Sequence, residues 1–219
     1  MELEKLKAIQ IELKNKIHIK PYTGVVKNVL AIDSSYSKKL NKIISMAIIY
    51  DSNKKEIVDK TFEIKEVKFP YIPGFLSFRE IDTTISAIRK LHSKYDVVLV
   101  DGQGIAHPRG LGFASHLGVL LEKPTIGCAK SRLVGNYNEV GAKRGDFSYL
   151  IHNSKVVGAV LRTKANVKPI FISPGNLIDI DSSVKIILQL TKKYRLPEPI
   201  RFAHIFAEET KRLWEKQNF

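Results

Sequence analysis

Short hydrophobic runs separated by polar turns divide the chain into strands and helices. Alternating or continuous apolar runs predict strands, whereas apolar residues that recur every three or four positions predict amphipathic helices. These patterns predict strands over residues 28–37, 42–51, 55–65, 96–100, 124–131 and 169–175, with a hairpin over 148–163 that turns at Asn153 and Ser154. They predict helices over residues 3–17, 77–95, 112–123, 182–194 and 201–216.

The order of these elements predicts an α/β fold with a mixed sheet flanked by helices. The first three strands are joined by short turns and should pair antiparallel, and the later strands alternate with helices, which favours parallel pairing. We expect Ser77 and Glu80 to form a capping box for the helix over 77–95, and Pro174 with Gly175 to end the last strand. No internal repeat or linker is present, so we expect a single domain over residues 1–219.

The charge of the chain narrows the class of partner. Lys and Arg number 36 against 22 Asp and Glu, which gives a net charge of +14 and favours nucleic acid or an anionic membrane surface as partner. A solvated lysine-rich surface is the simpler alternative. No apolar run is long enough for a membrane span, and the charged N-terminus does not match a secretion signal. We therefore expect a cytoplasmic protein that has no membrane partner and acts as a monomer.

The single cysteine, Cys128, excludes an intramolecular disulfide and a cysteine-ligated zinc site. It lies in the predicted strand over 124–131, where a small buried apolar side chain is its expected role.

Three carboxylates stand where apolar runs meet turns or helix starts. Asp33 interrupts the first strand, Glu80 lies in the first turn of a helix, and Asp101 directly follows the run "DVVLV". Taken singly, they could be a turn residue, a helix cap and the start of an Asx-turn. If they cluster, their mutual repulsion requires protons or a cation, and oxygen ligands suit Mg²⁺ or Mn²⁺. Such ions catalyse displacement at phosphorus.

Four segments together resemble the endonuclease V family: "AIDSSYS", "PYIPGFLSFRE", "LVDGQGIAHPRGLGFASHLGVLL" and "PTIGCAKSRL". The order and spacing match over roughly residues 25–175, and "RFAH" near the C-terminus matches more loosely. The resemblance implies a ribonuclease H-like fold and Mg²⁺-dependent cleavage, with Mn²⁺ as a substitute, beside the hypoxanthine base of inosine in DNA. It implies a cut at the second phosphodiester on the 3′ side, leaving 3′-hydroxyl and 5′-phosphate ends, in the repair of deaminated adenine.

The same resemblance assigns roles to individual residues. Asp33, Glu80 and Asp101 would be the metal-binding carboxylates, and His204 matches a further metal-site position that varies within the family. Lys130 matches a lysine near the scissile phosphate and the attacking water. The choice between DNA and RNA, duplex and single strand, stays open.

A pocket for the expelled base is expected around the glycine-rich loop. Gly104, with Ile105 behind it, would let the backbone approach the ring, and the resemblance adds His107 and Leu133 as pocket walls. The alternative is that the glycines only permit a tight turn between strand and helix. A dinucleotide-binding loop is disfavoured, because the required glycine spacing places His107 at the third position.

The loop "PYIP" projects Tyr71 and Ile72 between two prolines, and the resemblance gives these residues the role of a wedge between base steps. A rigid connector with Tyr71 packed on the core is the alternative. We expect Arg109 and Arg132 to hold phosphates, and His116, which lies among apolar residues, to be structural.

Two other functions are compatible with the sequence. One is a non-catalytic binder of inosine-containing RNA or DNA, and the other is a related ribonuclease H-like nuclease that acts on RNA–DNA hybrids. The complete set of Asp33, Glu80 and Asp101 argues against a binder, because clustered negative charge facing phosphates weakens binding unless a cation is held there.

Overall fold

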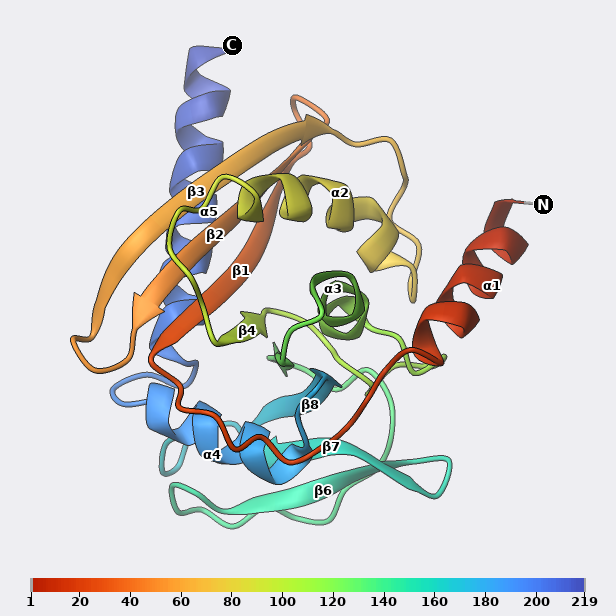
Figure 1. Ribbon diagram of the computed structural model, residues 1–219, viewed down its shortest axis with the longest axis vertical. Helices are drawn as coiled ribbons and strands as arrows, with labels where there is room; N and C mark the ends of the chain where they lie inside the picture. Colours follow the sequence, from red (N-terminus) through yellow and green to blue (C-terminus); the bar gives the residue numbers. More distant parts are fainter. Residues whose placement is uncertain (1, 219) are drawn as a thin grey trace.

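One eight-stranded sheet organises the fold of the computed structural model, which describes residues 2–218 (Figure 1). The strand order across the sheet is β3-β2-β1-β4-β5-β8-β7-β6. The strands are β1 (Asn28–Ser37), β2 (Lys42–Asp51), β3 (Glu56–Glu66), β4 (Val97–Val100), β5 (Thr125–Ala129), β6 (Phe147–His152), β7 (Lys155–Leu161) and β8 (Ile170–Asn176).

The pairing confirms the predicted mixed sheet. Strands β1, β2 and β3 pair antiparallel, β1 pairs parallel with β4, and β4 pairs parallel with β5. The sheet then continues with antiparallel pairs of β5 with β8, β8 with β7 and β7 with β6. In the register of β1 and β4, Ile32 lies opposite Val100. Asp33, within β1, and Asp101, directly after the end of β4, therefore lie side by side on neighbouring strands.

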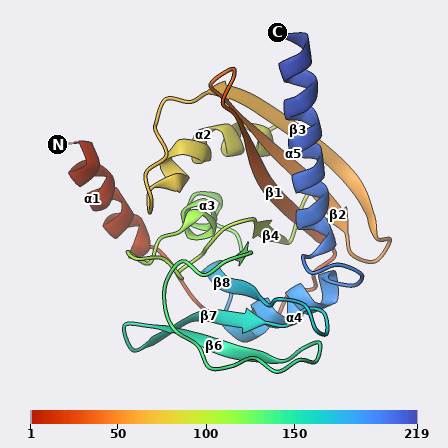
Figure 2. The ribbon, with the colours of Figure 1, turned by 180° about the vertical axis from the view of Figure 1, so that it is seen from behind.

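Helices cover both faces of this sheet (Figures 1 and 2). The helices are α1 (Glu2–Lys14), α2 (Leu76–Ile88), α3 (Phe113–Leu121), α4 (Ile180–Leu190) and α5 (Glu198–Gln217). One core cluster joins Leu30 and Val98 to α2 and α3, and another joins Val29 and Leu99 to α4 and α5. Successive residues of β1 and β4 thus pack on opposite faces, as expected for strands that are covered on both sides.

The start of α2 differs from the sequence prediction. The helix begins at Leu76 after Phe75, which makes no side-chain cap hydrogen bond, so the capping-box prediction for Ser77 and Glu80 is wrong. Ser77 lies inside the first turn, where its hydroxyl is buried without a partner among the described residues. The capping hydroxyl must precede the helix to accept from its free N–H groups, and Ser77 comes too late.

Three element ends also differ from prediction. Helix α2 ends at Ile88 rather than near residue 95, and Asp59 then accepts hydrogen bonds from the backbone N–H groups of His92 and Ser93 at 2.8 and 2.9 Å. Helix α4 ends at Leu190, before the Lys and Tyr that were expected to close it. Helix α5 begins at Glu198 with a proline in its first turn, where the missing N–H needs no helical partner.

Strand β8 continues through Pro174 and Gly175 to Asn176, so the prediction that this pair stops the strand is wrong. A register shift between Thr125 and Ile126 of β5 accommodates the proline. The carbonyl of Pro174 accepts the N–H of Ile105 at 2.8 Å, so this strand is held to the loop after β4 rather than released.

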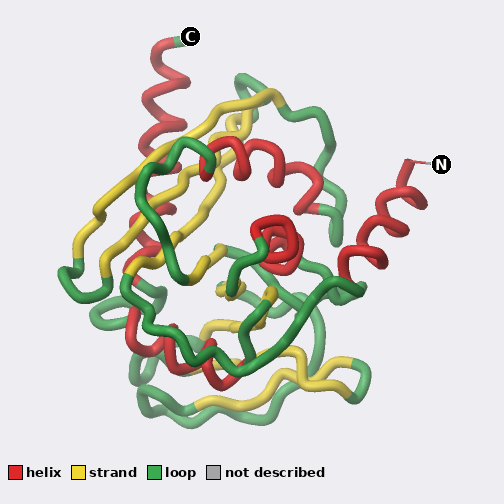
Figure 3. Tube along the Cα trace, in the orientation of Figure 1, coloured by secondary structure: helices red, strands yellow, loops and turns green. Residues whose placement is uncertain are grey.

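The turn between β6 and β7 matches its prediction. Asn153 and Ser154 have φ angles of 49° and 59°, as a two-residue hairpin turn requires. Between β5 and β6 the chain forms a long loop (Figure 3), which contains only an isolated bridge between Asn136 and Ile151. None of the helices within residues 2–218 combines the length and the apolar composition that a bilayer span requires.

Candidate active site

Three side chains converge where Asp33 within β1 and Asp101 directly after β4 meet His204 of α5. Each offers one ligand atom, and these atoms lie within 4.8 Å of one another. His204 Nδ1 lies 2.7 Å from Asp33 Oδ2, and both carboxylate side chains are largely buried. The parallel pairing of β1 with β4 brings the carboxylates together, and α5 supplies the imidazole from the face that it covers.

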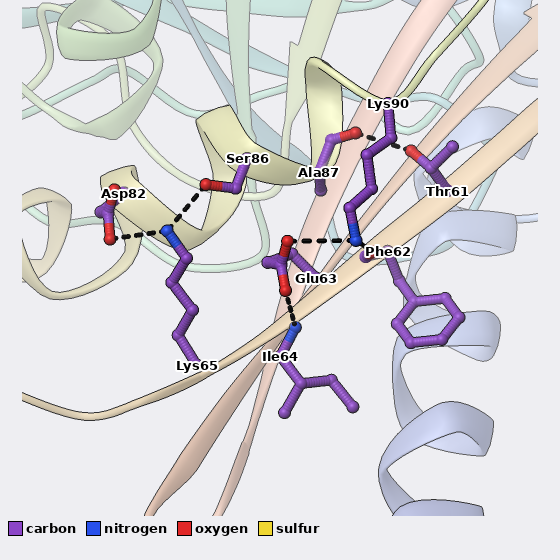
Figure 4. A network of polar contacts seen from close by, with 9 residues as sticks. All are labelled: Thr61, Phe62, Glu63, Ile64, Lys65, Asp82, Ser86, Ala87 and Lys90. Atoms are coloured by element: carbon purple, nitrogen blue, oxygen red, sulfur yellow. Dashed lines mark hydrogen bonds and ion pairs between the residues drawn. The ribbon is translucent and has the colours of Figure 1, made fainter.

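Glu80 enters the site from α2, on the other face of the sheet, where it forms a hydrogen bond with Ser34. Polar contacts fix the position of α2 against β3 (Figure 4). Lys65 Nζ lies 2.8 Å from Asp82 Oδ2, and the Thr61 hydroxyl donates to the carbonyl of Ala87 at 2.7 Å. Both contacts lie further along α2 than Glu80 and hold the helix that carries it against β3.

The carboxylates repel one another strongly. Burial raises the pKa of Glu80 to about 8, and the charge of Asp33 adds to this effect. Burial and the charge of Asp101 raise the pKa of Asp33 to about 6, although its hydrogen bond to His204 opposes the rise. Both shifts have the sign that burial and neighbouring like charges produce. A divalent ion bound by these carboxylates would offset their mutual repulsion and favour their ionised forms.

Lys130 follows β5 and completes the charged group. Its Nζ donates to Asp101 Oδ2 at 2.7 Å. Partial burial opposes the ammonium charge, but the hydrogen bond and the charge of Asp101 outweigh it and raise the pKa of Lys130. The lysine is therefore cationic at neutral pH. The guanidinium of Arg195, a residue that the sequence analysis did not identify, donates to the backbone carbonyl of Lys130 at 2.8 Å and anchors this end of the strand.

The ligand types fit a divalent cation. Asp33 and Asp101 provide oxygen atoms and His204 provides nitrogen. Glu80 lies outside this group of mutually close ligand atoms, but the charges of both aspartates act on it. Carboxylate-rich sites of this kind suit Mg²⁺ and Mn²⁺, and an imidazole ligand is also compatible with Mn²⁺.

A cavity of about 200 Å³ opens directly beside this cluster. Gly102 and Ser131, which follow Asp101 and Lys130 in the chain, both line it. Its volume lies below the about 300–1,000 Å³ of pockets for drug-sized ligands and suits a single base. The remaining lining residues are Tyr71, Gly74, Leu76, Ser77, Gln103, His107, Leu111, Gly112, Phe113, Ala129, Arg132 and Leu133.

Gly104 and Ile105 are not among these lining residues. The N–H of Gly104 donates to Ser173 Oγ at 2.6 Å, and its carbonyl accepts from Gly112. A Cβ at position 104 would lie only 2.0 Å from the carbonyl oxygen of Pro174. The structure thus shows close backbone packing at Gly104, and direct contact of Gly104 and Ile105 with a base stays a prediction.

The expected wedge residues lie at the mouth of the cavity or next to it. Tyr71 is 62% exposed and lines the cavity, so it is not packed on the core, as the connector alternative required. Ile72 is half-buried and does not line the cavity. Leu133 also lines the cavity and is 47% exposed.

His107 is a buried wall of the cavity. Burial lowers the pKa of His107 to about 4, and the charge of nearby Arg109 acts in the same direction. The imidazole is therefore neutral at physiological pH and can present hydrogen-bonding atoms without adding charge to the cavity.

Arg109 is occupied within the protein. Its guanidinium donates to Gln10 of α1 and to the carbonyl of Gly74, and it stacks on the ring of Phe75 with 4.3 Å to the centroid. Gln10, fully buried, also donates to Gly74 at 2.9 Å. This network joins α1 to the loop that carries Tyr71. The sequence analysis missed Gln10, although a glutamine on the apolar stripe of the N-terminal helix was a visible signal.

Arg132 and His116 occupy different environments. Arg132 is exposed at the rim of the cavity, where its guanidinium lies 5.8 Å from the ring centroid of Tyr137. His116 is buried in α3 with its ring against Phe78, and burial lowers the pKa of His116 to about 4. This packing agrees with a structural role for His116.

Comparisons with known proteins agree on one family. The sequence model of the endonuclease V family matches residues 11–205. The chain is 43% identical to Endonuclease V of Kosmotoga olearia over 213 residues, covering 97% of this chain and 93% of that protein. It is 46% identical to the Dictyoglomus thermophilum protein of the same name over 201 residues, covering 92% and 87%.

Solved structures show the same relationship. The crystal structure of Endonuclease V from Streptomyces avermitilis matches with a TM-score of 0.92 at 36% identity, covering 98% of this chain and 94% of that chain. A Ciona intestinalis Endonuclease V variant, solved in complex with a 23mer DNA containing an inosine followed by a ribo-adenosine, matches with a TM-score of 0.86 at 28% identity, covering 96% and 97%.

Proposed function

The chain belongs to the endonuclease V family of nucleases, and from this premise we propose that it cuts nucleic acid beside inosine in a Mg²⁺-dependent reaction. The scissile bond is the second phosphodiester on the 3′ side of the lesion, and the products carry 3′-hydroxyl and 5′-phosphate ends. The observation that supports this most strongly is the position of the carboxylate cluster and Lys130 beside a base-sized cavity. DNA is the proposed substrate, with inosine-containing RNA as the alternative.

Asp33, Asp101 and Glu80 would hold the ion, and His204 would contribute from α5. When bound, the ion would activate water and neutralise charge on the reacting phosphate. His204 has a further role through its 2.7 Å contact with Asp33, because it fixes the orientation of that carboxylate. Burial and the charge of Asp33 raise the pKa of Glu80 to about 8, so a bound cation would favour loss of its proton.

Lys130 acts on the phosphate rather than on the base. Its ammonium is held 2.7 Å from Asp101 and by the clamp of Arg195 on its carbonyl. A cation at this position attracts the phosphate and stabilises the negative charge that develops in the transition state. The Lys130 ammonium has three N–H donors. If Asp101 binds an ion, the donor that now contacts Asp101 could instead orient the attacking water.

The cavity supplies the specificity. An expelled hypoxanthine would enter between Tyr71 and Leu133, with neutral His107 as an inner wall. Unstacking costs a few kcal/mol, and stacking of a base on an aromatic side chain returns about 1–3 kcal/mol. An exposed Tyr71, backed by Ile72, can therefore hold open a duplex that mispairing has already weakened.

Replacing Asp101 by alanine tests this assignment. The variant should bind an inosine-containing duplex and fail to cut it, because the cavity is intact and the cluster is broken. Cleavage at the rate of the unmodified protein would refute the assignment. Parallel assays on plain duplex and on RNA–DNA hybrid distinguish an inosine nuclease from a hybrid nuclease, and absence of cutting on every substrate would instead favour a non-catalytic binder.

A further inference from the structure

A second concave surface adjoins the base cavity and has no role in the function proposed above. It is a groove of about 350 Å³ between the end of α1 and the hairpin of β6 and β7. We call it the α1–hairpin groove. The lining residues that matter here are Lys14, Ile17, Ile105, His107, His152 and Lys155.

The groove carries positive charge without a negative counterpart. Lys14 and Lys155 line it from two different elements, and its lining contains no Asp or Glu. Within residues 3–218, neither ammonium group is within ion-pair distance of a carboxylate. By contrast, Lys7 pairs with Glu4 within α1, and Lys16, just after the helix, pairs with Glu12, each at 2.7 Å. The lysines that face the groove are therefore available to an external anion.

The groove is held in a fixed relation to the base cavity. The aliphatic stem of Lys14 lies against Gly110, where an added Cβ would be 2.9 Å from Cε of the lysine. Helix α1 is itself fastened to the cavity wall, since Gln10 and Arg109 both donate to the carbonyl of Gly74. A cation on such a support loses little conformational entropy when an anion binds.

His107 belongs to both concave surfaces, because it lines the base cavity and the α1–hairpin groove. Gly102 and Ser131, the cavity residues next to the carboxylate cluster in the chain, do not line the α1–hairpin groove, so the groove adjoins the base cavity through other residues. In a bound strand with its expelled base in the cavity, the chain runs in one direction to the scissile phosphate at the cluster. The nucleotides in the other direction from the base would then reach the groove. For a cut 3′ to the lesion, that other direction is the 5′ side.

We propose that the α1–hairpin groove binds the sugar-phosphate backbone of the substrate strand on the 5′ side of the expelled base, with Lys14 and Lys155 contacting phosphates. The proposal rests on the proposed function, which gives the strand its direction. The apolar residues Ile17 and Ile105 in the same groove can pack against sugars, which carry no charge. The groove thus extends the nucleic-acid interface without reading sequence.

Single-turnover cleavage of inosine-containing single strands tests the proposal. One substrate carries a long 5′ flank, a second has the 5′ flank cut back to one nucleotide, and a third has only the 3′ flank shortened. Lys14→Gln and Lys155→Gln should each raise the half-saturating protein concentration on the long strand about two- to fivefold. Each should also lower the salt dependence of binding by about 0.7 in the log–log slope. Both effects should vanish on the strand with the trimmed 5′ flank.

Two control variants test whether the effect depends on the position of the lysine and on its charge. Lys185→Gln removes the same charge from α4, on the other face of the sheet, and should show no dependence on the flank. Lys155→Arg keeps the charge and should restore the slope. The proposal is overturned if the lysine variants retain the salt slope of the unmodified protein, if their loss persists on the trimmed 5′ flank, or if the loss follows the 3′ flank. Failure of the unmodified protein to prefer inosine over adenosine would overturn the proposed function itself and the groove assignment with it.

Discussion

Replacing Glu80 by glutamine tests how much stability the folded protein loses when this buried carboxyl group ionises, and whether cleavage requires the carboxylate. Burial and the charge of Asp33 raise the pKa of Glu80 from 4.5 to about 8. The folded protein therefore holds a proton that the unfolded chain releases. The stability that this proton provides is complete below pH 4.5 and is lost as the pH rises towards 8. At pH 7 the loss amounts to about 3 kcal/mol.

Glu80→Gln cannot lose this proton, so it should be more stable than the unmodified protein by up to about 3 kcal/mol at pH 7 with a chelator present. The two proteins should be equally stable at pH 4. Denaturant unfolding at both values of pH measures the difference, and Glu139→Gln, at an exposed position, is the matched control.

Added Mg²⁺ gives the second half of this test. Binding to the folded state alone should stabilise the unmodified protein by mass action, and the variant should gain less and should cut inosine-containing strands poorly. Equal or lower stability of Glu80→Gln at pH 7 in the chelator would refute the reasoning, since it would mean that burial and the charge of Asp33 do not disfavour the ionised form of Glu80.

Three further predictions concern the proposed wedge residue Tyr71, the close backbone packing at Gly104 and the buried imidazole of His116. Tyr71→Ala should slow cleavage of inosine duplex more than cleavage of single strands, through a lost stacking interaction of about 1–3 kcal/mol, and equal losses would contradict the wedge. Gly104→Ala should lower the free energy of unfolding by about 3 kcal/mol or more, since its Cβ would lie 2.0 Å from the Pro174 oxygen; a loss below about 1 kcal/mol would contradict the close packing. Burial lowers the pKa of His116 from 6.5 to about 4, so its stability contribution is complete above pH 6.5 and falls by about 2 kcal/mol at pH 5. His116→Gln should therefore lose less stability than the unmodified protein between pH 7 and pH 5, with His92→Gln at an exposed position as control; an equal loss would contradict the buried neutral imidazole.

The local hydrophobic pattern was sufficient to predict which segments form strands and helices. Strand β4 is apolar throughout because both of its faces are covered, and its unbroken apolar run indicates this in the sequence. The ends of elements were less predictable, because they depend on distant partners. Strand β8 passes through Pro174 since β5 and the loop at Ile105 accept the irregularity. Beyond the end of helix α2 at Ile88, Asp59 from β3 accepts hydrogen bonds from the backbone N–H groups of His92 and Ser93 and holds the chain out of the helix.

The candidate site was predictable to the extent that its residues are chemically unusual for their positions. Asp33 and Asp101 interrupt or follow apolar strands, which marks them in the sequence alone. The support of the site was not predictable in this way, because the contacts of Arg109 with Gln10 and of Arg195 with Lys130 join segments far apart in the chain. Whether the whole chain folds as one unit stays a prediction.

The central claim is that the clustered carboxylates bind a divalent ion that enables cleavage beside inosine. The most direct test is cleavage of an inosine-containing strand and a matched adenosine strand with Mg²⁺, with the product ends mapped and a chelator control. The account predicts one cut, at the second phosphodiester 3′ to inosine, with 3′-hydroxyl and 5′-phosphate ends, and none with chelator or adenosine. Equal cutting of both strands, or cutting that persists in the chelator, would contradict it.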